Sequence, residues 1–414
     1  MNSKTRLVQS EKWWLRWIQN VSSFTKPAIL NSFAEEFKPS PDVVIYGIND
    51  LDQIPDCAPL EKEYYKSLVQ NGISHFIKNI SAELSLIKVD THFFPLLVAS
   101  ENYKDAYVCS PFGNYVLLAL ESLQSIRNPL LKKIGALGLY FLGKLIKATK
   151  INSVAYINHS LFSTDIQPDH LSLAQIEKIV SVLKAKYPNH SIIFRSLNSF
   201  GCPQLKEKLR ICNFKFIASR LIYLTAANDR RLFQTRIIKG DLKLWNAKSY
   251  EIVPGTKFST EDELRILELY SMLSIEHHSR CNPEININFI KLLIKNPLFQ
   301  FKALKKDGKI DGFVGYYIQD KILHCPLLGY DKCSPKSNEI YRLLSTMLLI
   351  EAAANANIFH QSAGASFFKK TRRAKGFQEY QAVYSRHLMW KQRTAWFIIK
   401  TLLNVFAIPF MKKY

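Results

Sequence analysis

One order of predicted strands and helices occurs twice along the 414 residues, and this repeat constrains the fold more than any other feature. In the first half, apolar residues that alternate predict strands, and apolar residues spaced three and four apart predict helices. The expected strands are 92–100, 106–110, 153–159, 190–197 and 218–225, and the expected helices are 172–187 and 202–212. Alternating strands and helices with a closing strand pair indicate a mixed α/β sheet.

A polar segment near residue 228 separates this first half from the second. Two helices, at 261–278 and 282–298, then precede a three-strand meander at 298–306, 309–319 and 321–330. A helix at 337–356 has so broad an apolar surface that it must be buried between layers, and strands at 358–362 and 380–388 follow it. The sequence therefore predicts a basic and aromatic segment at 1–40, folded units at 41–228 and 229–390, and an amphipathic basic tail at 391–414.

Residues 250–388 resemble a known family. Their order of two helices, a meander, a central helix, a strand, a small basic helix and a closing strand is that of the Gcn5-related N-acetyltransferase (GNAT) superfamily. The ending, Phe368-Lys369-Lys370 and then Lys375-Gly376-Phe377, is similar to that of the FemAB-like branch, in which two such units follow one another. The resemblance implies two tandem GNAT-like units that transfer an acyl group from an activated donor to an amine.

In the superfamily, the pyrophosphate of acyl-CoA rests on N–H groups at the start of the helix after the fourth strand, a site suited to anions. The matching turn here contains Gly329, Lys332, Lys336, Ser337 and Asn338, and it lacks the usual glycine-rich phosphate loop. The resemblance implies acyl-CoA as the donor, and the missing loop keeps aminoacyl-tRNA, which FemAB-like proteins take, as the alternative. An ordinary turn capped by Ser337 is the alternative to any donor site.

Residues 360–375 supply the second part of the predicted donor site. Small residues there, including Gly364, would let a ligand approach the backbone closely. A cluster of cations would face phosphate, and its members are Lys369, Lys370, Arg372 and Arg373. The alternative is a basic helix in solvent or on lipid headgroups.

The transfer also needs acid and base groups, because an amine that attacks an acyl donor must lose a proton. We predict Glu379 as the base and Tyr330 as the acid or orienting group, with a structural role as the alternative for each. His324 and His360 are expected in the core, and segment 275–281, with two adjacent histidines, either binds an acceptor or ends a helix. The seven scattered cysteines favour a reducing compartment, and no metal is expected.

The net charge of +22 should attract polyanions, a class that includes nucleic acid, an anionic membrane and a phosphorylated cofactor. The chain shows no zinc-finger, OB-type or KH-type signature, so we expect no sequence-specific nucleic acid partner. The expected acceptor is a small-molecule or lipid-linked amine. A non-catalytic basic protein, which binds membranes or polyanions on the same scaffold, is the alternative function.

Two apolar stretches with basic flanks, at 132–144 and 393–414, are relevant to membranes. Each is shorter than the roughly 20 apolar residues of a spanning helix. The second suits either an interfacial helix or a final helix docked on the core. Since no secretory signal is visible, we expect a cytoplasmic protein with peripheral contact at the inner membrane face.

Overall fold

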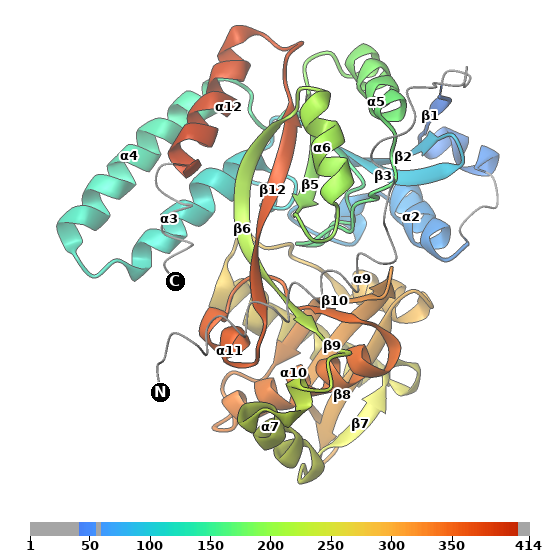
Figure 1. Cartoon of the computed structure of the whole chain (residues 1–414), viewed down its shortest axis with the longest axis vertical. Coiled ribbons are helices and arrows are strands. Elements are labelled where there is room, and N and C mark those ends of the chain that lie inside the picture. Colours follow the sequence, from blue (N-terminus) through green and yellow to red (C-terminus); the bar gives the residue numbers. More distant parts are fainter. Residues whose placement is uncertain (1–40, 55–58, 405–414) are drawn as a thin grey trace, which may run out of the picture. The chain divides into compact units, whose positions relative to one another are not determined.

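The structure is a computed structural model that describes residues 41–54 and 59–404, and in this part of the chain one mixed sheet of 12 strands organises the fold (Figure 1). The sheet order is β1-β2-β3-β4-β5-β12-β6-β11-β10-β9-β8-β7. The first-half strands are β1 (Val43–Tyr46), β2 (Glu83–Val89), β3 (His92–Ala99), β4 (Val154–Ile157), β5 (Ser191–Leu197) and β6 (Lys215–Ala226). The second-half strands are β7 (Glu251–Pro254), β8 (Gln300–Lys306), β9 (Lys309–Gln319), β10 (Ile322–Tyr330), β11 (Ile358–His360) and β12 (Lys375–Tyr384).

Both halves have the same topology. In each, the first four strands pair antiparallel, and the fourth then pairs parallel with the fifth, as β4 does with β5 and β10 with β11. The two sixth strands change places, because β12 lies between β5 and β6 while β6 lies between β12 and β11. The sheet therefore runs without a break past residue 228. The predicted repeat and the mixed α/β fold class of two GNAT-like units are confirmed.

In the described part of the chain, helices cover the sheet, and the buried apolar side chains of helices and strands form three clusters. One cluster lies under α5 and α6, and another under α7 and α10. The largest contains residues from both halves, including Leu68 of α2 and Phe289 of α9, so the halves share a core. The α-helices are α2 (Pro59–Asn71), α3 (Leu118–Ser122), α4 (Pro129–Ala148), α5 (Leu173–Lys186), α6 (Pro203–Ile211), α7 (Arg236–Asn246), α8 (Thr260–Tyr270), α9 (Ile287–Lys295), α10 (Ser337–Asn355), α11 (Ser366–Thr371) and α12 (Trp390–Leu402).

The halves differ where the third strand connects to the fourth. A tight turn at Asp320 and Lys321, both with positive φ, joins β9 to β10. Between β3 and β4 stand instead the π-helix η3 (Gly113–Leu117), α3 and α4. The strand expected at 106–110 is wrong, because the Cys109 N–H turns back to the Ala106 carbonyl at 3.1 Å. The segment is therefore the beginning of a helical insertion in the first half.

The tail prediction can be judged up to residue 404. Helix α12 is docked on the core, because Trp396 is 1% exposed and its indole N–H donates to Ser191 Oγ at 2.8 Å. Its outer side exposes Trp390 and Phe397. Residues 1–40 and 405–414 lie outside the described residues. In the described ranges, no helix combines the length and apolar character needed to cross a membrane.

A buried carboxylate joins three helices of the second half, and this gives a stability prediction. Asp241 of α7, 3% exposed, accepts from Arg342 Nε of α10 at 2.9 Å and from Arg372 Nε, just after α11, at 2.7 Å. We expect Asp241→Ala to lower the unfolding free energy by about 3 kcal/mol or more, since it leaves two cations uncompensated. Chemical denaturation measures the change, and Glu207→Gln, in an exposed ion pair, should cost less than about 0.5 kcal/mol. Equal effects of the two substitutions would contradict this role of Asp241.

Candidate functional site

The candidate site begins where the parallel strands β10 and β11 separate. They pair from Ile322 with Ile358 to His324 with His360, where β11 ends. Beyond this point β10 contains a register shift between His324 and Leu327, and Pro326 within it has no N–H to offer a neighbouring strand. The sequence thus ends the parallel pairing after three residue pairs and opens a split in the sheet.

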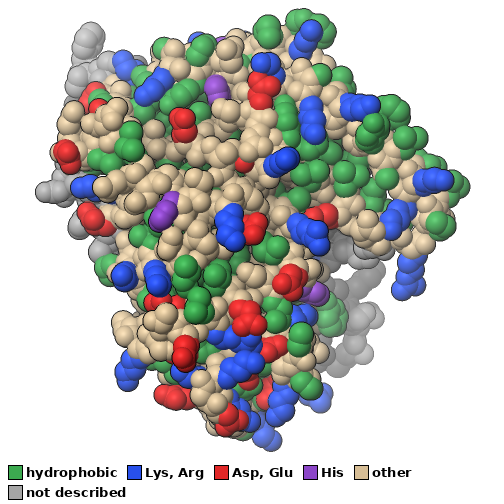
Figure 2. Space-filling model, turned by 180° about the vertical axis from the view of Figure 1, so that it is seen from behind, with side chains coloured by type: hydrophobic (Ala, Val, Ile, Leu, Met, Phe, Trp, Pro, Cys, Tyr) green, Lys and Arg blue, Asp and Glu red, His purple; other side chains and the backbone are tan. Residues whose placement is uncertain are grey.

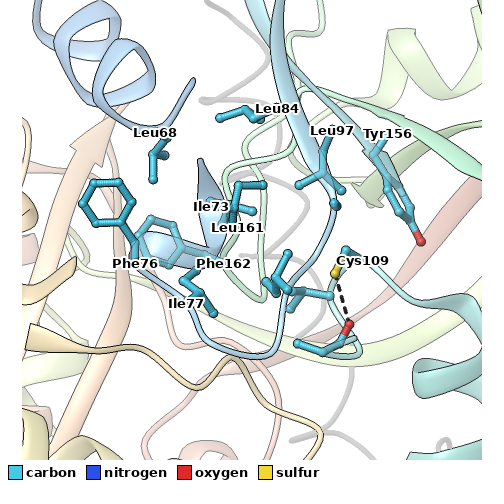
Figure 3. Packing of buried hydrophobic residues seen from close by; sticks show 14 of the residues in the cluster. Leu68, Ile73, Phe76, Ile77, Leu84, Leu97, Cys109, Tyr156, Leu161 and Phe162 are labelled. Carbon is cyan, nitrogen blue, oxygen red and sulfur yellow. Dashed lines mark hydrogen bonds between the residues drawn. The ribbon is translucent and has the colours of Figure 1, made fainter. Parts of the chain in front are cut away.

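A cavity of about 330 Å³ lies at this split. Strand β10 contributes Pro326 and Leu327 to its wall, and the loop after β11 contributes residues 362–364. The first half contributes Leu161, Phe162 and Ser163. Figure 3 shows Leu161 and Phe162 beside Ile77, another wall residue, within the packed core. The wall is therefore built from both halves of the chain and anchored by buried side chains.

Arg220 of β6 lines this cavity with a charged side chain. Its Nε donates to Glu379 Oε2 of β12 at 2.7 Å, and its Nη2 donates to the Ser163 carbonyl at 2.6 Å and to Thr164 Oγ1. Burial lowers the pKa of Arg220, but the Glu379 carboxylate, together with Tyr107 and Asp165, raises it by more, so the pKa lies above its ordinary value. In the described part of the chain, no hydrogen bond uses Nη1 of Arg220, which leaves this donor for a ligand.

The loop after β11, residues 361–365, is held in an unusual conformation. Ser362, Gly364 and Ala365 all have positive φ, which is costly for residues other than glycine. The Lys369 ammonium stabilises the loop by donating to the carbonyls of Gln361 at 2.5 Å and Ala363 at 2.7 Å. Burial, and then the Arg220 charge, lowers the pKa of Lys369 to about 7. Lys369 is thus a buried support of the cavity wall, where the sequence analysis expected an open phosphate ligand.

The other predicted cations differ in what they can reach. Arg372 is held by Asp241 and lies over the Phe368 ring at 3.4 Å, so it is occupied by these contacts. Lys370 and Arg373 are exposed, and Arg373 has a φ of 65°. Gly364 lines the cavity, as predicted for a position of close approach. Of the predicted patch, only the two exposed residues retain a surface position suited to phosphate.

The turn after β10 is less uniform than expected. Gly329 is buried, and a Cβ there would lie 2.8 Å from the Leu269 backbone, so its glycine serves packing against α8. Helix α10 begins at Ser337, and Lys336 is its N-cap without a side-chain hydrogen bond, so Ser337 does not cap the helix. Lys336 and Asn338 are exposed, while Lys332 is half-buried. The helix start therefore presents backbone N–H groups beside lysines at the surface.

Neither predicted acid-base residue lines the cavity. Glu379 is 2% exposed and pairs with Arg220, so its observed contact is to hold that guanidinium. Tyr330 faces Tyr341 of α10, with ring centroids 5.6 Å apart.

His278, at the end of the π-helix η7 (Ser271–His278), does line the cavity. The His278 side chain is also exposed to solvent, and its partial burial, followed by the charges of His277, Lys332 and Lys369, lowers its pKa. Its imidazole is consequently neutral at physiological pH.

In the first half, the loop after β4 is held against β5 by its own contacts. After β4, the Asp165 N–H donates to Ser196 Oγ of β5 at 3.0 Å. Arg195 of β5, 5% exposed, pairs with the Asp165 carboxylate at 3.2 Å. These contacts hold loop 158–166 against β5, where the second half has open space. A second cavity, of about 460 Å³, lies along the start of β3 and this same loop, and Leu298, Phe299 and Tyr317 of the second half complete its wall.

Arg220 and His278 were missed by the sequence analysis. A single arginine within the apolar strand 218–225 was a signal for the first, because a central strand rarely buries a charge without a partner. For His278, the adjacent histidines at 277 and 278 marked the right segment but not the ring that would reach a cavity. His324 and His360 are buried as predicted, with ring centroids 4.7 Å apart.

No family model matches the sequence, and no curated protein was found to match it. Similar solved structures include FemX, with 8% identity over 60% of this chain and 83% of that chain and a TM-score of 0.45. L-PGS from Bacillus licheniformis has 13% identity over 55% and 77%, with a TM-score of 0.42. A GCN5-related N-acetyltransferase from Kribbella flavida has 10% identity over 83% and 71%, with a TM-score of 0.34. By its own strand order, the chain has the fold of two tandem GNAT-like units, with the open split in the second.

Proposed function

We propose that this protein is an N-acyltransferase, which transfers an acyl group from acyl-CoA to an amine in the cavity at the split of β10 and β11. The observation that carries the proposal is the position of Arg220, a partly buried cation at that cavity with one donor nitrogen not used by the described residues. Among the described residues, Asp165 links the loop after β4 to Ser196 of β5, whereas β10 and β11 separate beside the cavity that Arg220 lines. The first half then supplies one wall of the site.

Arg220 acts on the acyl carbonyl in this proposal. When the amine attacks, negative charge develops on the carbonyl oxygen, and a fixed cation in a buried site stabilises that charge without reorganising. Glu379 and the Ser163 carbonyl fix the guanidinium from two sides. The amide bond forms as the bond to the donor sulfur breaks, and the attacking amine loses its proton.

His278 accepts that proton. A neutral imidazole at the cavity can act as a general base, and its neighbours keep it neutral near pH 7. The phosphates of the donor lie at the start of α10, where uncapped N–H groups suit an anion. The Glu339 carboxylate in the same first turn opposes an anion there. Lys332 and Lys336 supply the positive charge that offsets it.

His278→Gln gives a kinetic prediction. We expect kcat to fall about 100-fold, since a positioned base contributes at least this much. In the native protein the acid limb of the pH profile should lie below pH 6.5, because the pKa of His278 is lowered, and this limb should vanish in the variant. His277→Gln, at the exposed neighbour, is the control and should keep the rate near pH 7 and still show an acid limb, moved slightly upward because the His277 charge no longer lowers the pKa of His278. An unchanged pH profile in His278→Gln would remove this role.

Acyl-CoA turnover tests the proposal. The purified protein is incubated with acetyl-CoA or palmitoyl-CoA and a panel of primary amines, and the released CoA thiol is measured. Amine-dependent thiol release, weakened by Lys336→Glu, is the expected result. A parallel reaction follows transfer from radiolabelled aminoacyl-tRNA to the same amines. Transfer from the tRNA alone would replace the donor, and binding of CoA without any transfer would favour a non-catalytic binding protein.

A further inference from the structure

Helix α4 is positioned by its sequence against the first half of the chain. Asn128 caps it, accepting from the Leu130 N–H at 2.9 Å, and Pro129 occupies its first turn. On its inner side Gly143 allows close packing, because a Cβ there would already lie 3.3 Å from Phe112. Ile146 on the same side is 1% exposed. One side of α4 is therefore a conventional packed surface.

The opposite side of α4 is apolar and uncovered by the described residues. Residues spaced three and four apart share one face of a helix, and five such side chains are at least half exposed here. They are Leu130 (65%), Ile134 (59%), Leu137 (57%), Phe141 (60%) and Leu145 (50%), and we call them the apolar face of α4. A contiguous apolar surface of this kind marks an interaction site or an aggregation hazard.

The charges around this face select its partner. Helix α4 contains Lys132, Lys133, Lys144 and Lys147 and no acidic residue. Figure 2 shows Lys and Arg side chains beside hydrophobic ones at the end of the molecule where α4 lies. Two copies of the chain that met through this face would bring four lysines together, Lys133 and Lys144 of each α4, without a carboxylate of either helix. An anionic partner is the electrostatically matched occupant.

The place of α4 in the topology supports a dedicated role. The second half joins its third and fourth strands by a tight turn, whereas the first half inserts η3, α3 and α4 at the same connection. The repeated fold thus forms without this insertion. A long helix that the fold does not need, and that exposes its apolar side, must be stabilised by what it binds.

We propose that the apolar face of α4 inserts into the headgroup region of an anionic lipid bilayer, with Lys133 and Lys144 on lipid phosphates. The proposal goes beyond the acyl transfer and does not depend on it. The apolar face runs along α4, and Lys133 and Lys144 lie beside it. This pattern is typical of helices that lie at the interface between a bilayer and water. Four lysines within 20 residues exclude burial of the whole helix in hydrocarbon. The helix lies on the membrane and does not cross it.

Vesicle binding of the full chain tests this surface. Vesicles of equal parts phosphatidylglycerol and phosphatidylcholine should bind the protein, and vesicles of phosphatidylcholine alone should bind it far more weakly. Ile134→Ser with Phe141→Ser should weaken binding about 100-fold, from the loss of two buried apolar side chains. Lys133→Gln with Lys144→Gln should weaken it about 30-fold, from about 1 kcal/mol per lysine near anionic lipid.

Matched control variants change exposed residues elsewhere. Ile211→Ser with Leu264→Ser removes two apolar side chains, and Lys257→Gln with Lys295→Gln removes two charges. Both should bind vesicles as the native chain does. Three outcomes would overturn the proposal. The first is an equal loss of vesicle binding in the control variants. The second is unchanged vesicle binding with a lowered melting temperature in the α4 serine variant, which would mean that another part of this chain packs on the face. The third is a concentration-dependent dimer that the same serine substitutions abolish.

Discussion

Replacing Arg220 and Glu379 together by glutamine is expected to yield a folded protein that has lost 100- to 1,000-fold in the kcat of acyl transfer. The loss follows because the cation that faces the developing charge on the acyl oxygen is removed. Removal of one fixed donor of this kind lowers kcat by about 100- to 1,000-fold. Both residues must change, because Glu379 is 2% exposed, and its carboxylate without Arg220 would cost about 3 to 5 kcal/mol. The double substitution leaves two neutral amides in its place.

The control for this experiment is Lys302→Gln with Glu351→Gln. This partly buried ion pair joins β8 to α10 in the second half of the chain, and neither member lines the cavity. It should retain kcat, with a similar change in melting temperature. Full activity in the Arg220 and Glu379 double variant would contradict the assigned role of Arg220, and equal losses in both double variants would mean that any ion pair matters equally.

Unfolding free energy is expected to fall steeply as the pH drops below 6.5, because His324 and His360 are buried in neutral form. Burial lowers the pKa of His324 to about 3. Burial, and then the charges of His324, Arg220 and Lys369, lowers the pKa of His360 well below its ordinary value. Below about pH 6.5 these histidines bind protons in the unfolded chain but stay neutral in the native state. Their contribution to the unfolding free energy is therefore fully present above that pH and is lost as the pH falls. The loss should be about 1.4 kcal/mol per pH unit for each histidine, or roughly 5 kcal/mol for the pair by pH 4.5.

His324→Phe separates this pair from other acid effects. The phenyl ring keeps the stack on Tyr317, whose centroid lies 5.4 Å away, and it cannot take up a proton. Denaturation in urea at pH 6 and pH 5 should show the slope against pH reduced by about 1.4 kcal/mol per unit. His277→Gln, at an exposed histidine, should leave the slope unchanged. The same slope in native and His324→Phe proteins would mean that His324 is already protonated in the folded state.

Local pattern was enough to predict most elements of the fold. The alternation in 309–319 and the broad apolar surface of 337–356 depend on neighbours in sequence, and β9 and α10 form there. The exchange of β6 and β12 was not predictable in this way, because Gln378 of β12 pairs with Leu221 of β6 far along the chain. The turn at 106–110 was missed because its alternating apolar residues are buried without joining the sheet.

The site shows the same limit more sharply. Lys369 was correctly placed beside the loop after β11, but its sequence neighbours do not reveal that backbone carbonyls take up its ammonium. Likewise Glu379 was selected as a carboxylate near the cleft, while its partner Arg220 is 159 positions away. The exposed face of α4 was visible as an apolar stretch, and only the structure distinguishes its packed side from its open one.

A structure of the protein with a non-hydrolysable thioether analogue of acetyl-CoA tests the central claim most directly. The account predicts that the acyl end of the analogue lies between residues 326–327 and 362–364, within hydrogen-bond distance of Arg220 Nη1. The phosphates should lie at the start of α10, near Lys336. An analogue bound in the other cavity, beside Asp165 and Phe299, with the split of β10 and β11 empty, would contradict it.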